Sequence, residues 1–191
     1  MRSATLAATG VAATVGYLVG SVPVAVLVGG RHGVDPREVG DANPGYWNLR
    51  QHLGARAAAP VFAGDVAKGV AAALVGVAVA PEGAWGVGYV AVGSAMVGHA
   101  WPAFARFRGG RSVLTWAGGT CVLSPLAGSV AAGLFVAVAA TGRFASGARL
   151  GVAAFPLVQL LVEGPHRAAA TGGLMGIIGV RFALAPGDRP A

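Results

Sequence analysis

Residues 98–119 read GHAWPAFARFRGGRSVLTWAGG and lie between long apolar segments on both sides. Three arginines surround the glycine pair Gly109-Gly110 in the middle of this stretch. Glycine lets backbone N–H groups approach an anion closely, and a helix that begins just after the pair would direct its positive end to the same place. Arginine adds a planar group of donors that matches a phosphate. The stretch indicates either a phosphate site or a basic anchor of membrane topology with a flexible turn.

The composition is typical of a membrane protein. Of the 191 residues, 55% are hydrophobic and 11% are charged, whereas a soluble domain carries about 25% charged residues. The apolar runs are each about long enough to cross a hydrocarbon core of about 30 Å. The first run is too long for the core of a signal peptide, so we interpret it as a retained helix. We expect an all-α, polytopic integral membrane helix bundle in one domain, residues 1–191, with about seven transmembrane segments near 4–28, 57–80, 85–104, 113–123, 125–141, 150–162 and 168–185.

The basic residues set the expected orientation. The formal net charge is +7, but the sequence has no dense basic face of the kind that binds nucleic acid. With the N-terminus outside, twelve of the 14 basic residues fall on the inner side, Arg189 of the tail among them, and only Arg2 and Arg167 remain outside. This orientation places the long polar loop 30–56 and the glycine-pair stretch on the same cytoplasmic side. That convergence favours the phosphate site over the simple anchor.

Ionisable residues within apolar segments are candidates for function, because a charge inside a membrane is costly. Asp65 and Lys68 have i,i+3 spacing and can pair on one helix face. The alternative is a salt bridge that only locks helix packing. His99 lies near a helix end, where a packing or hydrogen-bonding role is more common than that of a base. The single cysteine, Cys121, excludes an internal disulfide and a cysteine metal cluster.

Three local features concern helix ends and helix packing. Gly16 and Gly20 have the GxxxG spacing that suits close packing of membrane helices. Pro23 is expected to kink the first segment, and Ser21 can satisfy the backbone group that the proline frees. Ser112 can cap the segment that follows the glycine pair.

Five short motifs follow one another along most of the chain. They read GSVP at 20–23, GDANPGYWN at 40–48, DVAKG at 65–69, GHAWP at 98–102 and FRGGR at 107–111. In these motifs the chain resembles the bacterial acyl-phosphate:glycerol-3-phosphate acyltransferases. The corresponding patterns of that family are Gly-Ser-x-Pro, Gly-Ser-Gly-Asn-x-Gly-Ala-Thr-Asn, Asp-x-x-Lys-Gly, Gly-His-x-x-Pro and Phe-x-Gly-Gly-Lys-Gly.

The resemblance implies a seven-helix protein of the bacterial cell membrane with its N-terminus outside and its active-site loops in the cytoplasm. It implies an enzyme of phospholipid biosynthesis that transfers an acyl group from a fatty acyl phosphate to the 1-hydroxyl of glycerol 3-phosphate. The products would be lysophosphatidic acid and phosphate. The implied partners are these two substrates and membrane lipid, and the resemblance implies neither a metal nor a diffusible cofactor.

The chain departs from the family's pattern in both loops and near its C-terminus. Asp41 and Ala42 stand where the family has serine and glycine, and Arg111 and Ser112 stand where it has lysine and glycine. The family's arginine just past the first loop falls on Gln51, unless Arg50 takes its place after a shift of one residue. The C-terminal His-x-x-Asn motif has no counterpart, and its positions align with Arg181 and Leu184.

From this comparison we expect catalytic roles for Asp41, Asn43 and Arg111. Arg111 and Arg108, with the amides of the glycine pair, would hold phosphate charge. The proton of the acceptor hydroxyl would pass to Asp41 or to a substrate phosphate oxygen, with Asp41 paired to Arg50 or protonated. The expected substrate-binding residues are Ser21, Asn48, Arg50, Asp65, Lys68, His99, Arg108, Gly109, Gly110 and Ser112.

Alternatives remain at the level of residues and of function. For Asn43 and Asn48, turns that stabilise the loop compete with direct substrate contact. A membrane relative of the family that binds lipid without catalysis, or that uses another acceptor, is a second functional hypothesis. A small transporter is a third, because the fourth segment is broken at Ser124-Pro125.

Overall fold

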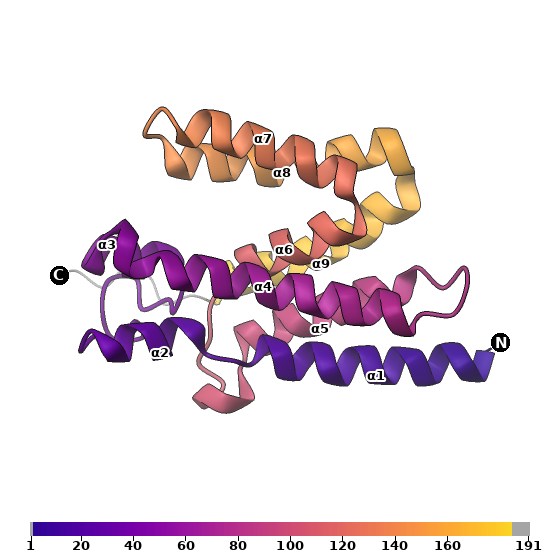
Figure 1. The fold of residues 1–191 in the computed structure, drawn as a ribbon, viewed down its shortest axis with the longest axis horizontal. Coiled ribbons are helices and arrows are strands. Elements are labelled where there is room, and N and C mark those ends of the chain that lie inside the picture. Colours follow the sequence, from indigo (N-terminus) through magenta and orange to yellow (C-terminus); the bar gives the residue numbers. More distant parts are fainter. Residues whose placement is uncertain (1, 185–191) are drawn as a thin grey trace.

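The computed structural model describes residues 2–184, and this part of the chain is helical and contains no strand. Figure 1 shows α4 through the middle of the bundle, with α1 and α2 along one side and the α7–α8 hairpin projecting from the other. The elements in chain order are α1 (Arg2–Gly20), α2 (Val24–Arg31), α3 (Tyr46–Leu53), α4 (Ala55–Val79), α5 (Gly86–Ala100), the 3-10 turn η1 (Ala103–Ala105), α6 (Val113–Leu123), α7 (Pro125–Ala139), α8 (Phe144–Glu163) and α9 (Pro165–Ala183). The predicted all-α fold class is confirmed.

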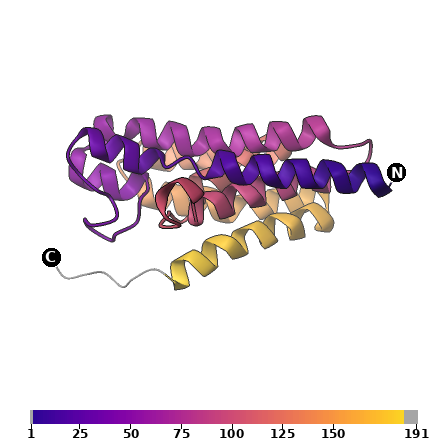
Figure 2. The ribbon, with the colours of Figure 1, turned by 90° about the horizontal axis from the view of Figure 1, so that it is seen from below.

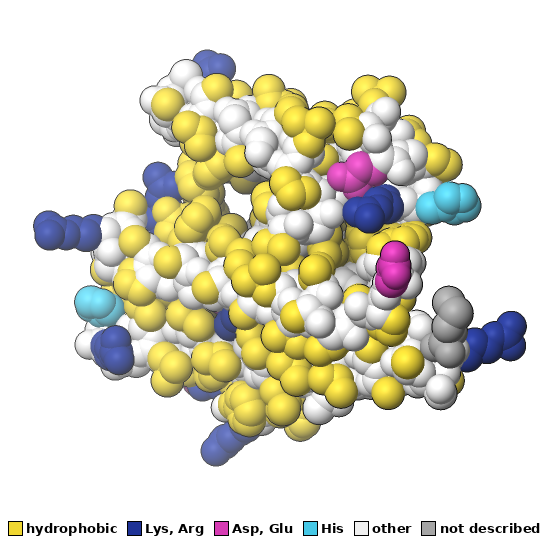
Figure 3. All heavy atoms as spheres, turned by 45° about the vertical axis from the view of Figure 1, so that its right-hand side comes forward, with side chains coloured by type: hydrophobic (Ala, Val, Ile, Leu, Met, Phe, Trp, Pro, Cys, Tyr) yellow, Lys and Arg dark blue, Asp and Glu magenta, His cyan; other side chains and the backbone are white. Residues whose placement is uncertain are grey.

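Length and apolar composition make three described stretches suitable for crossing a membrane: Arg2–Arg31, Ala55–Val79 and Phe144–Glu163. Two shorter helices, α6 and α7, are also apolar. Large apolar side chains lie uncovered on the outside, with Leu161 86% exposed and Leu6 74% exposed. Figure 3 shows a largely apolar flank with charged side chains toward its two ends. This pattern suits a bundle surrounded by lipid. The expected count of seven spans and the external N-terminus stay predictions, and Arg189 lies outside the described residues.

Glycines set the close packing of α1 against α5. A side chain at Gly16 would meet the backbone of Ala91, and one at Gly20 would meet the backbone of Ala95. From the opposite helix, Gly98 faces the Tyr17 carbonyl in the same way. The absence of side chains lets the two backbones touch, as the GxxxG spacing predicts.

Two breaks interrupt the apolar segments where the sequence places proline. Between α1 and α2, the Ser21 hydroxyl donates a hydrogen bond to the Tyr17 carbonyl (2.8 Å), which also accepts from the Ser21 backbone N–H (2.9 Å). The serine therefore does not satisfy the carbonyl that Pro23 frees. Between α6 and α7, Pro125 is the first residue of the new helix, a position where its missing N–H costs nothing. The second break lets α7 and α8 leave the bundle as a hairpin.

Two expected boundaries need correction. The polar loop 30–56 contains a short helix, α3, and α8 begins at Phe144, six residues before the predicted start of that segment. One aromatic cluster explains both: the Phe144 ring stacks on Trp47 at 5.6 Å and lies 5.5 Å from Tyr46. This packing stabilises one turn on each side, although the local sequence is polar there. Arg149, expected in a loop, is an exposed residue of α8.

Candidate active site

Three ionisable side chains meet inside the bundle. Lys68 Nζ donates to Asp65 Oδ1 at 3.0 Å across one turn of α4, which confirms the predicted pair. His99, in the last turn of α5, brings Nδ1 to 3.5 Å from Asp65 Oδ1 and to 3.4 Å from Lys68 Nζ. All three are buried: Asp65 is 2% exposed, Lys68 6% and His99 7%. A buried carboxylate and ammonium persist only when each has such a partner. We call these three residues the charged trio.

The glycine pair packs directly on the trio. A side chain at Gly110 would come within 2.5 Å of His99 Nε2 and 3.0 Å of the Pro44 carbonyl oxygen. A side chain at Gly109 would meet the His99 carbonyl and come within 2.5 Å of Pro102 Cδ. Both glycines are needed for this close approach. The amide of Gly110 donates to the His99 carbonyl (3.1 Å), so in this structure this amide already has an acceptor inside the protein.

A cavity opens between the break that follows α1, the charged trio and the glycine pair. Six residues of the expected site line it: Asp65, Lys68, His99, Arg108, Gly109 and Gly110. Apolar residues of the α1–α2 break and Pro44 of the first loop complete the lining. Because Arg108 is exposed, its positive charge lies at the outer edge of the cavity and that of Lys68 lies inside. Since Asp65 in the lining pairs with Lys68, the one surplus positive charge of the cavity is that of Arg108.

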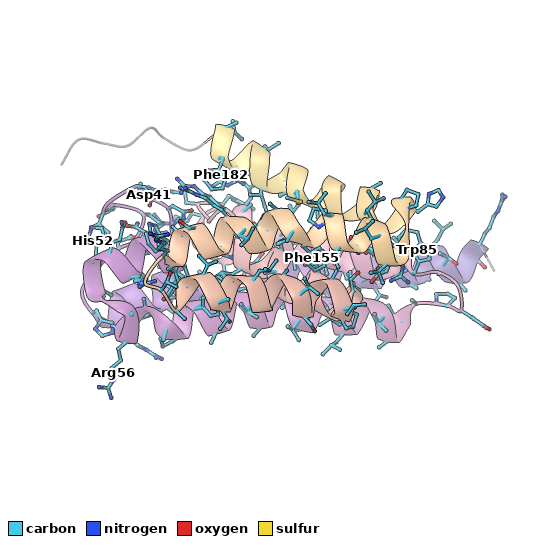
Figure 4. All side chains as sticks on the ribbon, turned by 90° about the horizontal axis from the view of Figure 1, so that it is seen from above. Asp41, His52, Arg56, Trp85, Phe155 and Phe182 are labelled. Carbon is cyan, nitrogen blue, oxygen red and sulfur yellow. The ribbon has the colours of Figure 1, made fainter. Side chains whose placement is uncertain are left out.

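The two polar loops are joined by an ion pair. Arg111 Nη1 donates to Asp41 Oδ2 at 2.8 Å, and the Arg111 guanidinium lies 4.5 Å from the ring centre of Phe182 in α9. Figure 4 shows Asp41 and Phe182 close together at one end of the bundle, with Trp85 at the other. Within the described part of the chain, the buried Nε of Arg111 has no hydrogen-bond partner. One donor of this guanidinium is thus unused.

Arg50 is not the partner of Asp41, which corrects that expectation. Its guanidinium lies over the aromatic cluster, 5.5 Å from the Trp47 ring centre and 4.7 Å from that of Phe144. This position holds α3 against the start of α8. Arg50 does not line the cavity.

The side chain of Asn48 stabilises the first loop. Asn48 is 1% exposed and its Nδ2 donates to the carbonyls of Pro36 and Val39, both at 2.9 Å, and more weakly to that of Asn43. The backbone N–H of Asn43 donates to Asp41 Oδ1 at 3.3 Å, so the side chain that forms the Asx turn is that of Asp41. Asn48 therefore has the loop-stabilising role that was the alternative to direct substrate contact. Neither Asn43 nor Asn48 lines the cavity.

The two serines use their hydroxyls on backbone carbonyls. Ser21 binds the Tyr17 carbonyl, and Ser112 donates to the Met96 carbonyl at 2.7 Å. Ser112 makes no side-chain cap to α6, so the predicted capping is wrong. Its φ of 62° turns the hydroxyl away from the helix start and toward α5. Neither serine lines the cavity.

Two residues take up a left-handed backbone where the resembled family has glycine. Ala42 has a φ of 53° and Ser112 a φ of 62°. This conformation costs an L-residue roughly 1–2 kcal/mol, whereas glycine adopts it freely. The loop geometry is kept in this chain although both glycines are absent, and the hydrogen bond of Ser112 to Met96 offsets part of the cost.

Arg181 is the site residue that the sequence did not single out. From the end of α9 it donates from Nη2 to the Gly109 carbonyl (2.7 Å) and from Nε to the Gly110 carbonyl (3.1 Å). Its guanidinium lies 5.2 Å from the ring centre of Trp101. Arg181 thereby fixes the glycine pair from the side opposite His99. Its alignment with the absent His-x-x-Asn motif was the one signal that could have identified it.

An ion pair orders the start of the first loop. Arg37 Nη2 lies 2.6 Å from Asp35 Oδ2, and the Arg37 backbone N–H also donates to this carboxylate. The Arg37 side chain holds the pKa of Asp35 below its usual value, with a smaller contribution from Arg108. Arg108 is thus close enough to the first loop to act on its charges.

A helix bundle with an apolar exterior, a buried charged trio and arginines beside a glycine turn is typical of a membrane protein with a polar site at one end. Comparison with known sequences gives the family. A sequence model of the family "Glycerol-3-phosphate acyltransferase" matches residues 10–185. The chain belongs to the glycerol-3-phosphate acyltransferase family.

Individual relatives agree with this assignment. A glycerol-3-phosphate acyltransferase of Rubrobacter xylanophilus is 42% identical over 149 residues, which are 78% of this chain and 74% of the relative. One of Clostridioides difficile is 35% identical over 161 residues, 79% of this chain and 76% of the relative. The crystal structure of PlsY (YgiH), an integral membrane glycerol 3-phosphate acyltransferase, in its glycerol 3-phosphate form has a TM-score of 0.80 at 24% identity and covers 92% of this chain and 88% of its own. This structural likeness establishes the fold.

Proposed function

We propose that this protein transfers the acyl group of a fatty acyl phosphate to the 1-hydroxyl of glycerol 3-phosphate and releases lysophosphatidic acid and phosphate. The named activity of the relatives supports the acceptor and the type of reaction. The observation that carries the proposal is the cavity in which Lys68, His99 and Arg108 meet the glycine pair. No feature of this site favours the alternative without catalysis.

The reaction exchanges one acyl–oxygen bond for another. The bond between the acyl carbon and the phosphate oxygen breaks, the ester bond to the acceptor hydroxyl forms, and the hydroxyl proton leaves with the phosphate. An acyl phosphate is already activated, so holding both substrates in place can supply most of the rate acceleration. The remaining requirement is to stabilise the negative charge that gathers on the departing phosphate.

The cations of the site meet this requirement in two positions. Lys68, with His99 beside it, would receive phosphate charge inside the cavity, and Arg108 would receive it at the edge. Arg111, whose Nε is unused, would bind the phosphate of the acceptor. Asp41 is already paired with Arg111, so we assign the hydroxyl proton to a substrate phosphate oxygen and not to this carboxylate. We assign the cavity to the cytoplasmic side, on the distribution of basic residues.

The experiment is a product assay with purified protein in detergent, palmitoyl phosphate and labelled glycerol 3-phosphate. We expect labelled lysophosphatidic acid from the wild type. Arg111→Ala should lower kcat/KM for glycerol 3-phosphate at least about 100-fold, since one charged donor to a phosphate is worth about 3 kcal/mol in such a site. Arg56→Ala is the matched control, because Arg56 is exposed and points outward on the side of the bundle away from Asp41 and Phe182 (Figure 4).

The melting temperature of each variant separates loss of function from loss of fold. Arg56→Ala should keep the wild-type rate, and Arg111→Ala should melt within a few degrees of the wild type. If folded wild-type protein binds palmitoyl phosphate but forms no labelled product, glycerol 3-phosphate is not the acceptor and the proposal fails.

A further inference from the structure

A second, apolar groove lies outside the cavity, between α9 and the rest of the bundle. Figure 2 shows α9 separating from the bundle toward the end that carries the loops. One face of α5 forms the floor, Tyr17 of α1 forms one wall, and Leu174 and Ile177 of α9 form the other. Gly93 lies midway along this floor, and a side chain added there would meet only the flexible end of Leu174, at 3.1 Å. The depth of the groove depends on this missing side chain.

The two ends of the groove differ in polarity. At one end the ring of Tyr89 is buried, and its hydroxyl accepts a hydrogen bond from Gln159 Nε2 (2.8 Å) inside the protein. At the other end Tyr17 Oη donates to the Trp101 carbonyl (3.0 Å). The guanidinium of Arg181 lies over the ring of Trp101 in a cation–π contact. The groove is therefore closed by a packed aromatic ring at one end and leads to a cation at the other.

Helix geometry connects the open end to the active site. Trp101 follows Val97 of the groove floor by one turn, and Arg181 follows Ile177 of the groove wall by one turn. Arg181 also donates to both carbonyls of the glycine pair, which lines the cavity. A chain lying in the groove would thus present its head group to the same glycine turn that borders the charged trio.

The length of the groove matches one leaflet of a bilayer. The lining along α5 runs from Tyr89 to Val97, about 12 Å at 1.5 Å per residue, and one further turn to Trp101 brings the path to about 18 Å. Half of a hydrocarbon core of about 30 Å is about 15 Å. A fatty acyl chain that enters from the lipid with its head at the interface would fill this length.

We propose that the groove between α1, α5 and α9 binds the acyl chain of the acyl phosphate, with its phosphate past Arg181 at the glycine pair and the cavity, and that Gly93 sets the chain length it accepts. The inference rests on the proposed function, because it takes the acyl phosphate as the donor. The cation at one end of an otherwise apolar groove selects an amphiphile with an anionic head. Continuity with the glycine pair selects the donor substrate over lipid that only fills the space.

The test fills the groove at its middle and compares two chain lengths. Gly93 lies eight residues from Trp101, about 12 Å along the helix, so a palmitoyl chain must pass it and an octanoyl chain, half as long, need not. We expect Gly93→Leu to raise the KM for palmitoyl phosphate about tenfold and the KM for octanoyl phosphate less than twofold. The KM for glycerol 3-phosphate should stay unchanged, and Gly93→Ala should give a smaller shift in the same direction.

Gly176→Leu is the matched control. It lies within α9, where an added side chain meets nothing within 4 Å, so it makes the same change in helix propensity without entering the groove. It should leave both KM values unchanged. Equal effects of Gly93→Leu on the two chain lengths, or no effect on either, would overturn the proposal and would mean that bulk lipid occupies the groove.

A binding measurement keeps this test separate from the proposed function. The rise in melting temperature with palmitoyl phosphate and with octanoyl phosphate is recorded for the same three variants without any acceptor. Loss of the palmitoyl effect alone in Gly93→Leu supports the groove even if no lysophosphatidic acid forms. Product formation by wild type together with an unaltered palmitoyl effect in Gly93→Leu supports the enzyme and rejects the groove.

Discussion

The two ends of the bundle each hold a buried polar cluster, and the clusters differ in how their hydrogen bonds are completed. At the end away from the cavity, Gln159 is fully buried: its Nε2 donates to Tyr89 and Ser124, and its Oε1 accepts from Thr171 at 2.6 Å. Ser124 also donates to Glu163 Oε2 at 2.8 Å. Every polar end of the Gln159 amide has a partner within this outer cluster.

At the other end the groups are not mutually satisfied. The charged trio borders a cavity, and Arg111 keeps a buried Nε without a partner in the described residues. Of four cations at this end, Lys68 pairs with Asp65 and Arg111 with Asp41, while Asp35 is paired with Arg37. Arg108 and Arg181 make no ion pair within the described residues. A closed network stabilises a fold, whereas an open one with excess charge is available to a ligand. From this comparison we expect the closed network to contribute mainly to stability and the open end to bind a ligand.

The largest effect should come from Lys68→Met at the functional end. It removes the partner of buried Asp65, so we expect a loss of about 3 kcal/mol in the free energy of unfolding. Turnover should also fall at least about 100-fold, since the cavity loses its inner cation. The product assay and thermal unfolding in detergent measure the two effects.

The double variant Asp65→Asn with Lys68→Met separates these effects. Without the lone carboxylate, most of the stability should return, because two neutral buried groups of similar shape cost far less than one unpaired charge. Turnover should stay low. Recovery of turnover together with stability would show that the pair only locks helix packing, which is the structural alternative for these residues.

Gln159→Leu at the outer cluster should lower stability by an intermediate amount and leave turnover nearly unchanged. The hydroxyls of Tyr89 and Thr171 and the side chain of Ser124 lose a partner while buried, so we expect a loss of about 2 kcal/mol in the free energy of unfolding. The kcat of the folded protein should stay within about twofold of the wild type. A large fall in kcat at an unchanged folded fraction would contradict the division between the two ends.

The sequence predicted the elements that local signals define. The bounds of α6, Val113–Leu123, match the expected segment. Ser124-Pro125 marks its end, whereas the side-chain cap expected from Ser112 at its start is not formed. The Asp65–Lys68 pair follows from its i,i+3 spacing alone. The eight-residue α3 was missed because its apolar positions are too few for a helical period, and packing against Phe144 stabilises it.

Contacts between distant segments were the part that sequence could not supply. The Asp41–Arg111 pair joins residues 70 positions apart, and Arg181 reaches the glycine pair across more than 70 positions. Both depend on where α9 and the first loop come to lie after the helices pack. The sequence predicted Asp41 and Arg111 as site residues but paired Asp41 with Arg50 instead of Arg111. Arg181 was noted only because it aligns with a position of the missing His-x-x-Asn motif.

The smallest expected effect tests the backbone of the first loop at the functional end. Ala42→Gly should raise the free energy of unfolding by about 0.5–1 kcal/mol. Glycine removes the cost of a φ of 53°, and the greater freedom of glycine in the unfolded chain cancels part of the gain. Ala80→Gly is the matched control, since Ala80 ends α4 with a φ of −68° and the same change can only lower stability there. Opposite signs of the two changes in melting temperature would establish that the first loop stores strain next to the Asp41–Arg111 pair.

The outer cluster contains none of the non-glycine residues with positive φ that the described chain holds. Backbone strain that is held at one end alone is what a site shaped for a ligand, and not for stability, requires.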